Sequence, residues 1–433
     1  MTYFNQNIRP CLALWEPLFF LIVLGVSQTG IPMGFMRFSI YSTFVLFMVT
    51  SLSAFAGSGK SEPETVRIAT FNVSMDASNY LPENELPMLK SSPLPGVLEQ
   101  NHEQIRGIAE ILQRVRPDVV LLNEFDYIDK AVGIDVFRSD YLEVSQNGQA
   151  AIDYPYAYTA PVNTGVPSPF DLNRDGKASG SGDDAWAFGW YPGQYGMVIL
   201  SKYPLIAEDA RTFQHFLWKD MPGRHIPYVH DSDKQPTSES WFSEEAMAQF
   251  PLSSKSHWDV PVNIGDRVIH LLAAHPVPPV FDGPENRNGM RNYDEIRLFA
   301  DYLTPGRDNY LYDDNGVRGG LGEDASFVIL GDMNAQVGAG GVDGAIEQLL
   351  EHPRVNDVKP QSQGGKLHSP DIEGSQFHTA AWRKRVDYAL PSDDLVVKNA
   401  GVFWPVNDEP GADMMKKRQA SSDHRLVWID IVK

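Results

Sequence analysis

The sequence of 433 residues is poor in cysteine and in positive charge. Its only cysteine is Cys11. A single cysteine cannot form an intramolecular disulfide, so the fold must depend on its hydrophobic core. The 56 Asp and Glu outnumber the 36 Lys and Arg, which gives a formal net charge of −20. An acidic surface repels polyanions, so nucleic acid is a disfavoured but not an excluded substrate.

The N-terminal part has the pattern of a targeting segment. Met36 and Arg37 precede an apolar run at residues 38–55, and Ala54-Phe55-Ala56 is a small-x-small cleavage pattern. We therefore predict a signal peptide at residues 36–56, cleaved after Ala56. Residues 1–35 then form an upstream extension from a misplaced start, and residues 57–65 form a polar lead-in. A membrane anchor is the alternative reading of the apolar run.

Cleavage would leave a secreted or periplasmic bacterial protein without cysteine. It would also remove two basic residues and one acidic residue, which changes the net charge from −20 to −21. Residues 66–433 contain no internal repeat or low-complexity tract. That length is sufficient for one large domain.

Polar side chains lie at the ends of several predicted strands in this domain. Apolar, β-branched runs predict strands at residues 66–71, 117–122, 268–274, 327–330 and 425–431. The first four lead to Asn72, Glu124, His275 and Asp332, and Asp423 precedes the fifth. Rigid strands that carry polar groups at their ends can build a well-defined site.

Helical periodicity is confined to three segments. It predicts helices at residues 101–116, 292–303 and 343–351, with Asn101 and Asp343 as N-caps of the first and the third. Strand-rich segments with intervening helices favour an α+β fold. Residues 76–100 and 212–258 are predicted to be insertions, and the aromatic residues of the second are expected to form apolar walls at a substrate mouth.

The polar groups at these strand ends suit a divalent cation. Carboxylate and amide oxygens favour Mg²⁺, Mn²⁺ or Ca²⁺ over zinc. Clustered carboxylates repel one another unless a cation neutralises them. A cation with a protonatable histidine beside it is suited to hydrolysing a phosphate ester.

A separate loop has the oxygen spacing of a calcium site. Asp171, Asn173 and Asp175 occupy its first, third and fifth positions, and Gly176 the sixth. The twelfth position is Gly182 instead of a bidentate glutamate. A structural Ca²⁺ and an ordinary solvated turn both remain open.

Six motifs in a fixed order carry a resemblance to a known superfamily. They are Ala69-Thr70-Phe71-Asn72, Leu121-Leu122-Asn123-Glu124, Ala273-Ala274-His275-Pro276, Leu330-Gly331-Asp332-Met333-Asn334, Arg385-Val386-Asp387-Tyr388 and Ser421-Ser422-Asp423-His424-Arg425. Together they resemble the deoxyribonuclease I-like endonuclease/exonuclease/phosphatase superfamily, and within it a secreted bacterial branch. The resemblance implies a four-layer α/β sandwich, with two packed mixed β-sheets flanked by helices, and metal-dependent hydrolysis of phosphate esters.

The resemblance also implies roles for individual residues. Metal ligands would be Asn72, Glu124 and Asp423, holding Mg²⁺ or Mn²⁺, with Ca²⁺ as an alternative. The catalytic residues would be His275, which protonates the leaving oxygen, Asp332 and Asn334, which orient water and phosphate, and His424, which contacts the phosphate and pairs with Asp387. Tyr195, Arg383 and Arg385 are candidate substrate contacts, although an ordinary solvated charge run explains the arginines equally well.

Three functions follow from this reading. We favour a phosphatase or phosphodiesterase acting on small or lipid-like phosphoesters. An extracellular nuclease is the alternative, and a catalytically silent binding protein is a remote one. Nothing in the sequence implies a protein partner, so a monomer is expected.

Overall fold

The computed structural model describes residues 64–338 and 341–433. The predicted upstream extension, the signal peptide and nearly all of the lead-in lie outside the described residues. Within the described residues, no helix combines the length and the apolar character needed to cross a membrane.

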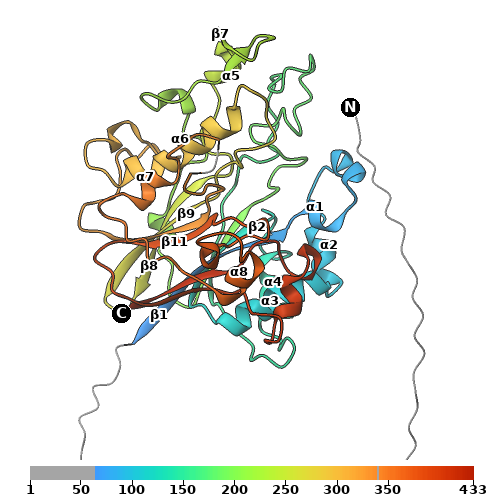
Figure 1. Cartoon of the computed structure of the whole chain (residues 1–433), viewed down its shortest axis with the longest axis vertical. Helices are drawn as coiled ribbons and strands as arrows, with labels where there is room; N and C mark the ends of the chain where they lie inside the picture. The colour runs from blue at the N-terminus through green and yellow to red at the C-terminus, as the bar shows by residue number, and fades with distance from the viewer. Residues whose placement is uncertain (1–63, 339–340) are drawn as a thin grey trace, which may run out of the picture. The chain divides into compact units, whose positions relative to one another are not determined.

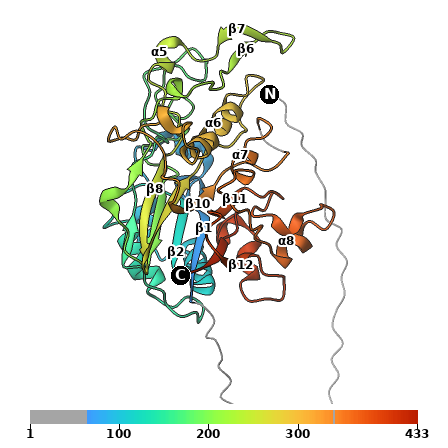
Figure 2. The ribbon, with the colours of Figure 1, turned by 90° about the vertical axis from the view of Figure 1, so that its left-hand side faces the viewer.

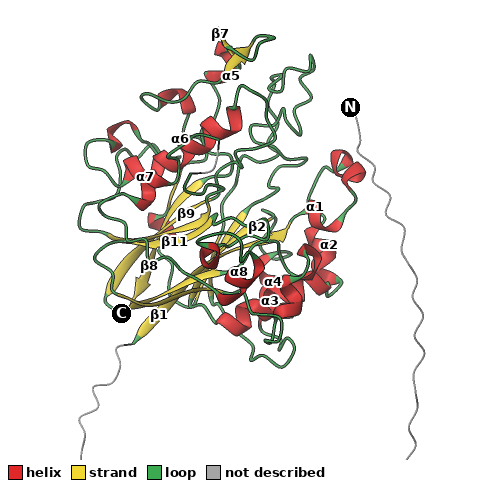
Figure 3. Cartoon of the chain, viewed as in Figure 1, coloured by secondary structure: helices red, strands yellow, loops and turns green. Residues whose placement is uncertain are grey.

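Two mixed β-sheets form the centre of the domain (Figures 1 and 3). The first sheet has the order β12 (Val397–Val402), β13 (Val427–Val432), β1 (Thr65–Met75), β2 (Val119–Phe125), β4 (Met197–Ser201) and β3 (Tyr156–Tyr158). The second has the order β11 (Asp387–Pro391), β10 (Ser326–Asp332), β9 (Arg267–Ala274), β8 (His257–Ile264) and β5 (Arg211–Thr212). Each sheet contains one parallel pair, β1 with β2 and β9 with β10. A separate hairpin joins β6 (Tyr228–His230) to β7 (Pro236–Ser240).

Two of the α-helices are long, and the others are short. The long ones are α3 (Glu103–Val115) and α6 (Arg287–Tyr302). The short ones are α1 (Ala77–Tyr80), α2 (Leu94–Glu99), α4 (Ile134–Phe137), α5 (Glu244–Met247), α7 (Glu347–Leu350) and α8 (Gln363–His368). Short 3₁₀ helices occur in several loops, among them η1 (Glu83–Met88) and η8 (Arg418–Ala420).

The alternation of side chains along each strand divides the core into layers. In β2, Val119 and Leu121 face the second sheet, whereas Val120 and Leu122 face α3. In β10, Val328 and Leu330 meet the first sheet, whereas residues 327 and 329 pack under α6. This period of two is expected for strands that are covered on both faces. Figure 2 shows β8 and β10 of the second sheet beside β1 and β2 of the first.

The outer layers complete the fold that the resemblance implied. Ile105, Ile108 and Leu112 of α3 pack on the first sheet, and Ile296 and Phe299 of α6 pack on the second. The α+β prediction and the four-layer sandwich are therefore confirmed, as are the five strands, although their ends differ by a few residues.

Both predicted helix caps are wrong. Asn101 has a left-handed φ of 50°, and the Nδ1 atom of His102 caps α3 by accepting a hydrogen bond from the backbone N–H of Gln104 at 3.2 Å. The third predicted helix begins only at Glu347 and has no side-chain cap, so Asp343 lies outside it. In both cases, the backbone conformation just before the helix determines which side chain can accept hydrogen bonds from the first N–H groups of the helix.

The predicted insertions are only partly loops. Residues 76–100 contain α1, η1 and α2. At the other insertion, the core strand β8 already begins at His257. Phe213, Phe216, Trp218 and Trp258 have no exposed surface. The prediction of apolar walls is therefore only partly confirmed: Phe213, Phe216 and Trp258 are core residues, whereas Trp218, Phe242 and Phe250 of the same segment line a cavity.

A glycine in β10 permits the close approach of two strands beside the polar strand ends. Gly331 has φ 149°, and a Cβ atom at this position would lie 1.9 Å from the carbonyl oxygen of Ala274. We expect Gly331→Ala to lower the free energy of unfolding by roughly 1–3 kcal/mol, the usual cost of overpacking. Urea denaturation would measure it. The control is Gly96→Ala in α2, where a Cβ atom meets nothing within 4 Å. Equal stability of the two variants would contradict the close approach.

Candidate active site

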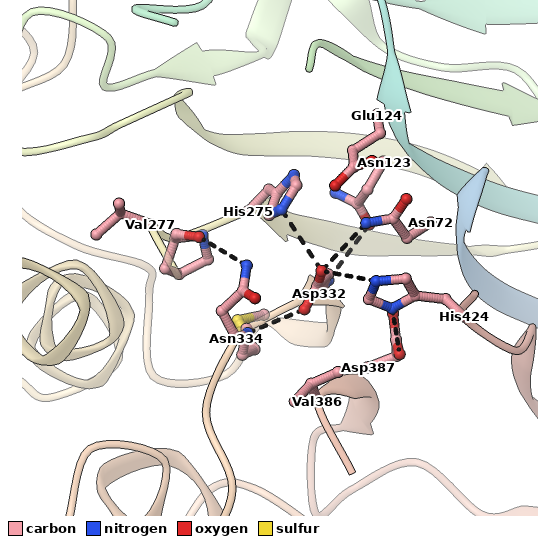
Figure 4. Close-up of polar contacts among 12 residues, drawn as sticks. Asn72, Asn123, Glu124, His275, Val277, Asp332, Asn334, Val386, Asp387 and His424 are labelled. Carbon is pink, nitrogen blue, oxygen red and sulfur yellow. Dashed lines mark hydrogen bonds and ion pairs between the residues drawn. The ribbon is translucent and has the colours of Figure 1, made fainter. Parts of the chain in front are cut away.

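The two sheets bring six polar strand ends to one place. Figure 4 shows Asn72 of β1, Glu124 of β2, His275 after β9, Asp332 of β10 and His424 before β13 converging around the Asp332 carboxylate. Asp387 is the register partner of Asp332 across the antiparallel β10–β11 pair. Segments as far apart in the sequence as Asn72 and His424, which are separated by 352 positions, therefore share one site.

Asp332 is the centre of this group and is buried. Its Oδ2 atom accepts a hydrogen bond from Asn72 Nδ2 at 3.1 Å and lies 3.5 Å from His275 Nε2 and 3.6 Å from His424 Nε2. Its Oδ1 atom accepts the backbone N–H of Asn334 at 3.0 Å. Burial raises the pKa of Asp332 to about 7, against the opposing charge of His424. This carboxyl group can therefore exchange a proton near neutral pH.

His424 and Asp387 form a buried pair. His424 Nδ1 lies 3.0 Å from Asp387 Oδ2, and the edge of Trp382 lies against the ring, with 4.8 Å between ring centroids. Burial alone would lower the pKa of His424, but the carboxylates of Asp387 and Asp332 raise it to about 10. His424 is therefore an imidazolium at neutral pH.

His275 differs from His424 although both contact Asp332. Burial, with the positive charges of Lys255 and His424, lowers the pKa of His275 well below its usual value. Its Nδ1 atom is buried and has no hydrogen-bond partner among the described residues. His275 is therefore neutral, and its Nδ1 atom is not engaged by another described residue.

Three carboxylates surround a single arginine on the other side of the site. Arg418 of η8 places Nη2 3.4 Å from Asp76 and 3.5 Å from Glu124, and its Nε lies 3.5 Å from Asp423. Burial and the charge of Asp76 raise the pKa of Glu124. Three negative charges and one positive charge leave this group with an excess of negative charge, which a divalent cation would balance.

The donor set therefore fits a divalent cation. Glu124 and Asp423 offer carboxylate oxygens and Asn72 lies beside them, so hard oxygen donors predominate. Close groups of possible ligand atoms among the described residues are Glu124–His275–Asp332 and Asp332–Asp387–His424. The second group is less suited to a cation, because its histidine already pairs with Asp387 and carries a proton.

Two charged residues of the cavity were not anticipated from the sequence. Lys255 is buried and lines the same cavity as His275 and Asp332. Arg418 follows Lys416 and Lys417, and such a run usually indicates a solvated surface. Only the fold brings Arg418 to the carboxylates, so no local pattern could have identified it.

Of the three predicted substrate contacts, Tyr195 lies at the cavity, whereas Arg383 and Arg385 do not. Tyr195 lines the cavity and has a left-handed φ of 58°. Arg385 is bound to both carboxylate oxygens of Asp357, at 2.6 and 3.0 Å, and Arg383 lies 3.4 Å from Asp371 at the surface. Neither arginine is among the lining residues; Lys384 is. Partners elsewhere on the surface hold these two guanidinium groups away from the cavity.

The candidate calcium loop is an internally hydrogen-bonded turn. Asp171 accepts the backbone N–H groups of Asp175 and Gly176 at 3.1 and 2.8 Å, and Asn173 also accepts that of Asp175 at 3.0 Å. These bonds form a polar turn without an ion. The structural Ca²⁺ stays a prediction.

With this geometry in place, comparison with known proteins identifies the family. The model of the Endonuclease/Exonuclease/phosphatase family matches residues 69–424. The chain belongs to this family. Its members hydrolyse phosphoester bonds, and the matched span contains every predicted catalytic and metal-binding residue.

Solved structures similar to the chain have low sequence identity to it and modest TM-scores. A family protein from Beutenbergia cavernae DSM 12333 is 14% identical, with a TM-score of 0.44, over 85% of this chain and 71% of that one. A beta toxin variant from Staphylococcus aureus with bound magnesium ions is 14% identical, with a TM-score of 0.38, over 86% of this chain and all of that one. Sphingomyelinase C from Streptomyces griseocarneus is 14% identical, with a TM-score of 0.39, over 85% and 99%. No curated protein matches the chain in sequence.

The His424–Asp387 pair should make stability depend on pH. The raised pKa of His424 means that the pair stabilises the fold fully below about pH 6.5, the unfolded pKa, and progressively less as pH rises towards 10. In chelator, Asp387→Asn should therefore cost roughly 3 kcal/mol at pH 6.5, as breaking a buried ion pair does, and less at pH 9.5. Urea denaturation at both pH values would measure this. The control is Asp371→Asn, which changes an exposed ion pair. A loss of unfolding free energy in Asp387→Asn that grows as pH rises would contradict the pairing.

Proposed function

We propose that this protein is a divalent-metal-dependent phosphoester hydrolase acting on small or lipid-like phosphoesters. The observation that carries the proposal is the position of Asp332. Its carboxylate meets His275, His424 and Asn72 within 3.6 Å, beside the carboxylate-rich pocket of Glu124 and Asp423.

In this proposal, Glu124, Asp423 and Asn72 hold the cation, which would polarise the phosphoryl oxygens when bound. Asp332 accepts a proton from the attacking water, for which a pKa near 7 is suitable. Asn334 is bound to the carbonyl of Pro276 at 3.1 Å and helps to shape the water site. His424, kept protonated by Asp387, stabilises the negative charge that develops on the phosphoryl group.

The role of His275 differs from the one implied by resemblance. A neutral imidazole is a poor proton donor, and a cation nearby would lower its pKa further. We therefore assign His275 a hydrogen bond to a phosphoryl or leaving oxygen instead of full proton transfer. Lys255 adds positive charge to the same cavity.

An extracellular nuclease remains the second candidate. The net charge of −20 disfavours a long polyanion, whose binding depends on contacts between phosphates and Lys or Arg. Arg383 and Arg385 are paired with acids away from the cavity. A binding protein without activity is less well supported, because all the predicted site residues are present.

Metal removal tests the proposal. We expect activity on a generic phosphodiester or phosphomonoester to disappear in chelator and to return with Mg²⁺ or Mn²⁺. Glu124→Gln should lower kcat/KM by at least about 100-fold, since it removes a positioned charged group. The control is Glu83→Gln, an exposed glutamate on the rim of the same cavity. Full activity in excess chelator would contradict the proposal.

A substrate panel separates the two candidate functions. The same metal-loaded protein is tested on small esters, an inositol phosphate, a phospholipid, and single- and double-stranded DNA. Efficient DNA degradation at moderate salt with little turnover of the small esters would favour the nuclease.

We also propose that the protein is exported and that cleavage occurs after Ala56. The apolar run and the Ala54-Phe55-Ala56 pattern support this proposal. Expression from Met36 in a bacterial host should give a mature N-terminus at Gly57 in the periplasm or medium, which N-terminal sequencing would detect. Ala54→Leu with Ala56→Leu should block cleavage, and an uncleaved, membrane-bound wild-type chain would contradict export.

A further inference from the structure

The cavity at the active site has a second, apolar region. The whole cavity measures about 1030 Å³, which is large for a phosphate group alone. The lining includes six large apolar side chains: Leu172, Trp186, Trp218, Phe242, Phe250 and Val277. Four of them belong to one core cluster and Trp186 packs against it, so these five lie together, with ring centroids 4.7–5.9 Å apart where Trp186, Trp218 and Phe242 meet Phe250. We call the part of the cavity that these six side chains line the apolar arm.

Two polar side-chain groups at the arm, the Trp218 indole N–H and the Arg291 guanidinium, already have partners inside the protein. The Trp218 indole N–H donates to Asp294 at 2.7 Å. The Arg291 guanidinium donates to the backbone carbonyls of Leu252, Trp186 and Pro251, at 2.8, 2.9 and 3.0 Å. A polar ligand group placed in the arm would lose its hydration without gaining hydrogen bonds from these groups. The arm therefore favours hydrocarbon.

The arm meets the Asp332 centre at Val277, whose backbone is held by hydrogen bonds. Val277 follows His275 by two residues, and its backbone N–H donates to the buried Glu295 carboxylate at 2.7 Å. Its carbonyl accepts a hydrogen bond from Asn292 at 2.8 Å, and Asn292 also donates to the carbonyl of Met333 at 3.0 Å. Helix α6 thus holds the arm and the strand ends together. A substituent on a phosphate at the centre would have a short path into the arm.

The rim of the cavity carries four exposed apolar side chains beside polar ones such as Glu83. The side chain of Phe281 is 85% exposed, and those of Val280, Phe188 and Trp382 are between 43% and 49% exposed. All four line the cavity. Isolated exposed apolar residues need no explanation, but four around one cavity mark a binding surface.

We propose that the apolar arm binds a hydrocarbon chain of the substrate, so that the preferred substrate is a phosphoester of an amphiphile. This inference rests on the proposed function, because it places the phosphate at the Asp332 centre. The inference adds that the hydrocarbon part of the ester is recognised, and that the apolar arm recognises it.

A chain-length series tests the proposal. The substrates are p-nitrophenyl alkyl phosphodiesters with methyl, butyl, hexyl and octyl groups, used with Mg²⁺ or Mn²⁺ below micelle-forming concentrations. Because the leaving group is constant, only the contact with the chain changes. We expect kcat/KM to rise by up to about fourfold for each methylene buried.

Variants locate the effect. Trp186→Ala and Val277→Thr should each lower the ratio of octyl to methyl kcat/KM by about fivefold or more, since they remove apolar contact or introduce a hydroxyl group. The matched control is Val317→Thr, at an exposed valine outside the cavity lining, which should keep the wild-type ratio. Circular dichroism and turnover of the methyl ester report whether each variant is folded.

A binding measurement does not depend on turnover. Octyl phosphate should bind the wild-type protein at least about tenfold more tightly than butyl phosphate by calorimetry, and Trp186→Ala should reduce this difference. If kcat/KM does not change with chain length while the methyl ester is hydrolysed in a metal-dependent way, the proposed role of the arm is wrong and the proposed function is unaffected. Tight octyl phosphate binding without turnover of any ester would support the arm and count against the proposed function. Equal binding of the two phosphates would overturn the arm.

Discussion

The burial of the Asp332 carboxylate is the constraint on which the site and the packing of the two sheets both depend. A buried carboxylate is tolerated only where its oxygens have partners. Those partners come from β1, from the segments after β9 and before β13, and from the chain just beyond Asp332 itself. Asn123 of β2 adds a link, because its Oδ1 accepts the backbone N–H of Asp332 at 3.3 Å and its Nδ2 donates to the carbonyl of Ala274 at 3.4 Å. The contacts that arrange the active site are therefore also polar contacts between the sheets.

The same arrangement gives the two histidines different protonation states. His424 pairs with Asp387 and holds its proton, whereas His275 lies near Lys255 and His424 and loses its own. Both touch the same oxygen of Asp332, which is thus flanked by one charged and one neutral ring. On the proposed function, this asymmetry assigns charge stabilisation to His424 and hydrogen bonding to His275. Environment, not residue type, distinguishes their roles.

The sequence predicted the parts of the molecule whose signal is local. Buried strands read as apolar runs, and a polar residue follows each run directly. Asn72, Glu124, His275 and Asp332 could therefore be named as candidates from the sequence alone, and the structure brings them together. The amphipathic periodicity of α3 was equally clear. The fold class followed from the order of the six motifs, and the match over residues 69–424 confirms it.

What the sequence could not predict depends on contacts between distant segments. Arg418 and Lys255 acquire their significance only when the fold brings them to carboxylates on other strands. Arg385 seemed free to meet a substrate, yet Asp357 holds it with two hydrogen bonds. The aromatic residues at 213–218 were expected at a mouth, but the second sheet and α6 bury them. Trp218 combines the two roles, since it is fully buried in the core and is also among the residues that line the cavity.

Helix α6 connects the chemistry to the selection of substrate. On one side it covers the second sheet through Ile296 and Phe299. Its Glu295 carboxylate binds the backbone N–H groups of Ser254 and Val277, the residues next to Lys255 and two beyond His275. One buried carboxylate therefore holds both the segment that contains Lys255 and the segment that runs from His275 to Val277 at the apolar arm. A chain seated in the arm contacts segments that are joined to the catalytic groups by hydrogen bonds. In such an arrangement, binding energy from the non-reacting part of a substrate can help to position its phosphate.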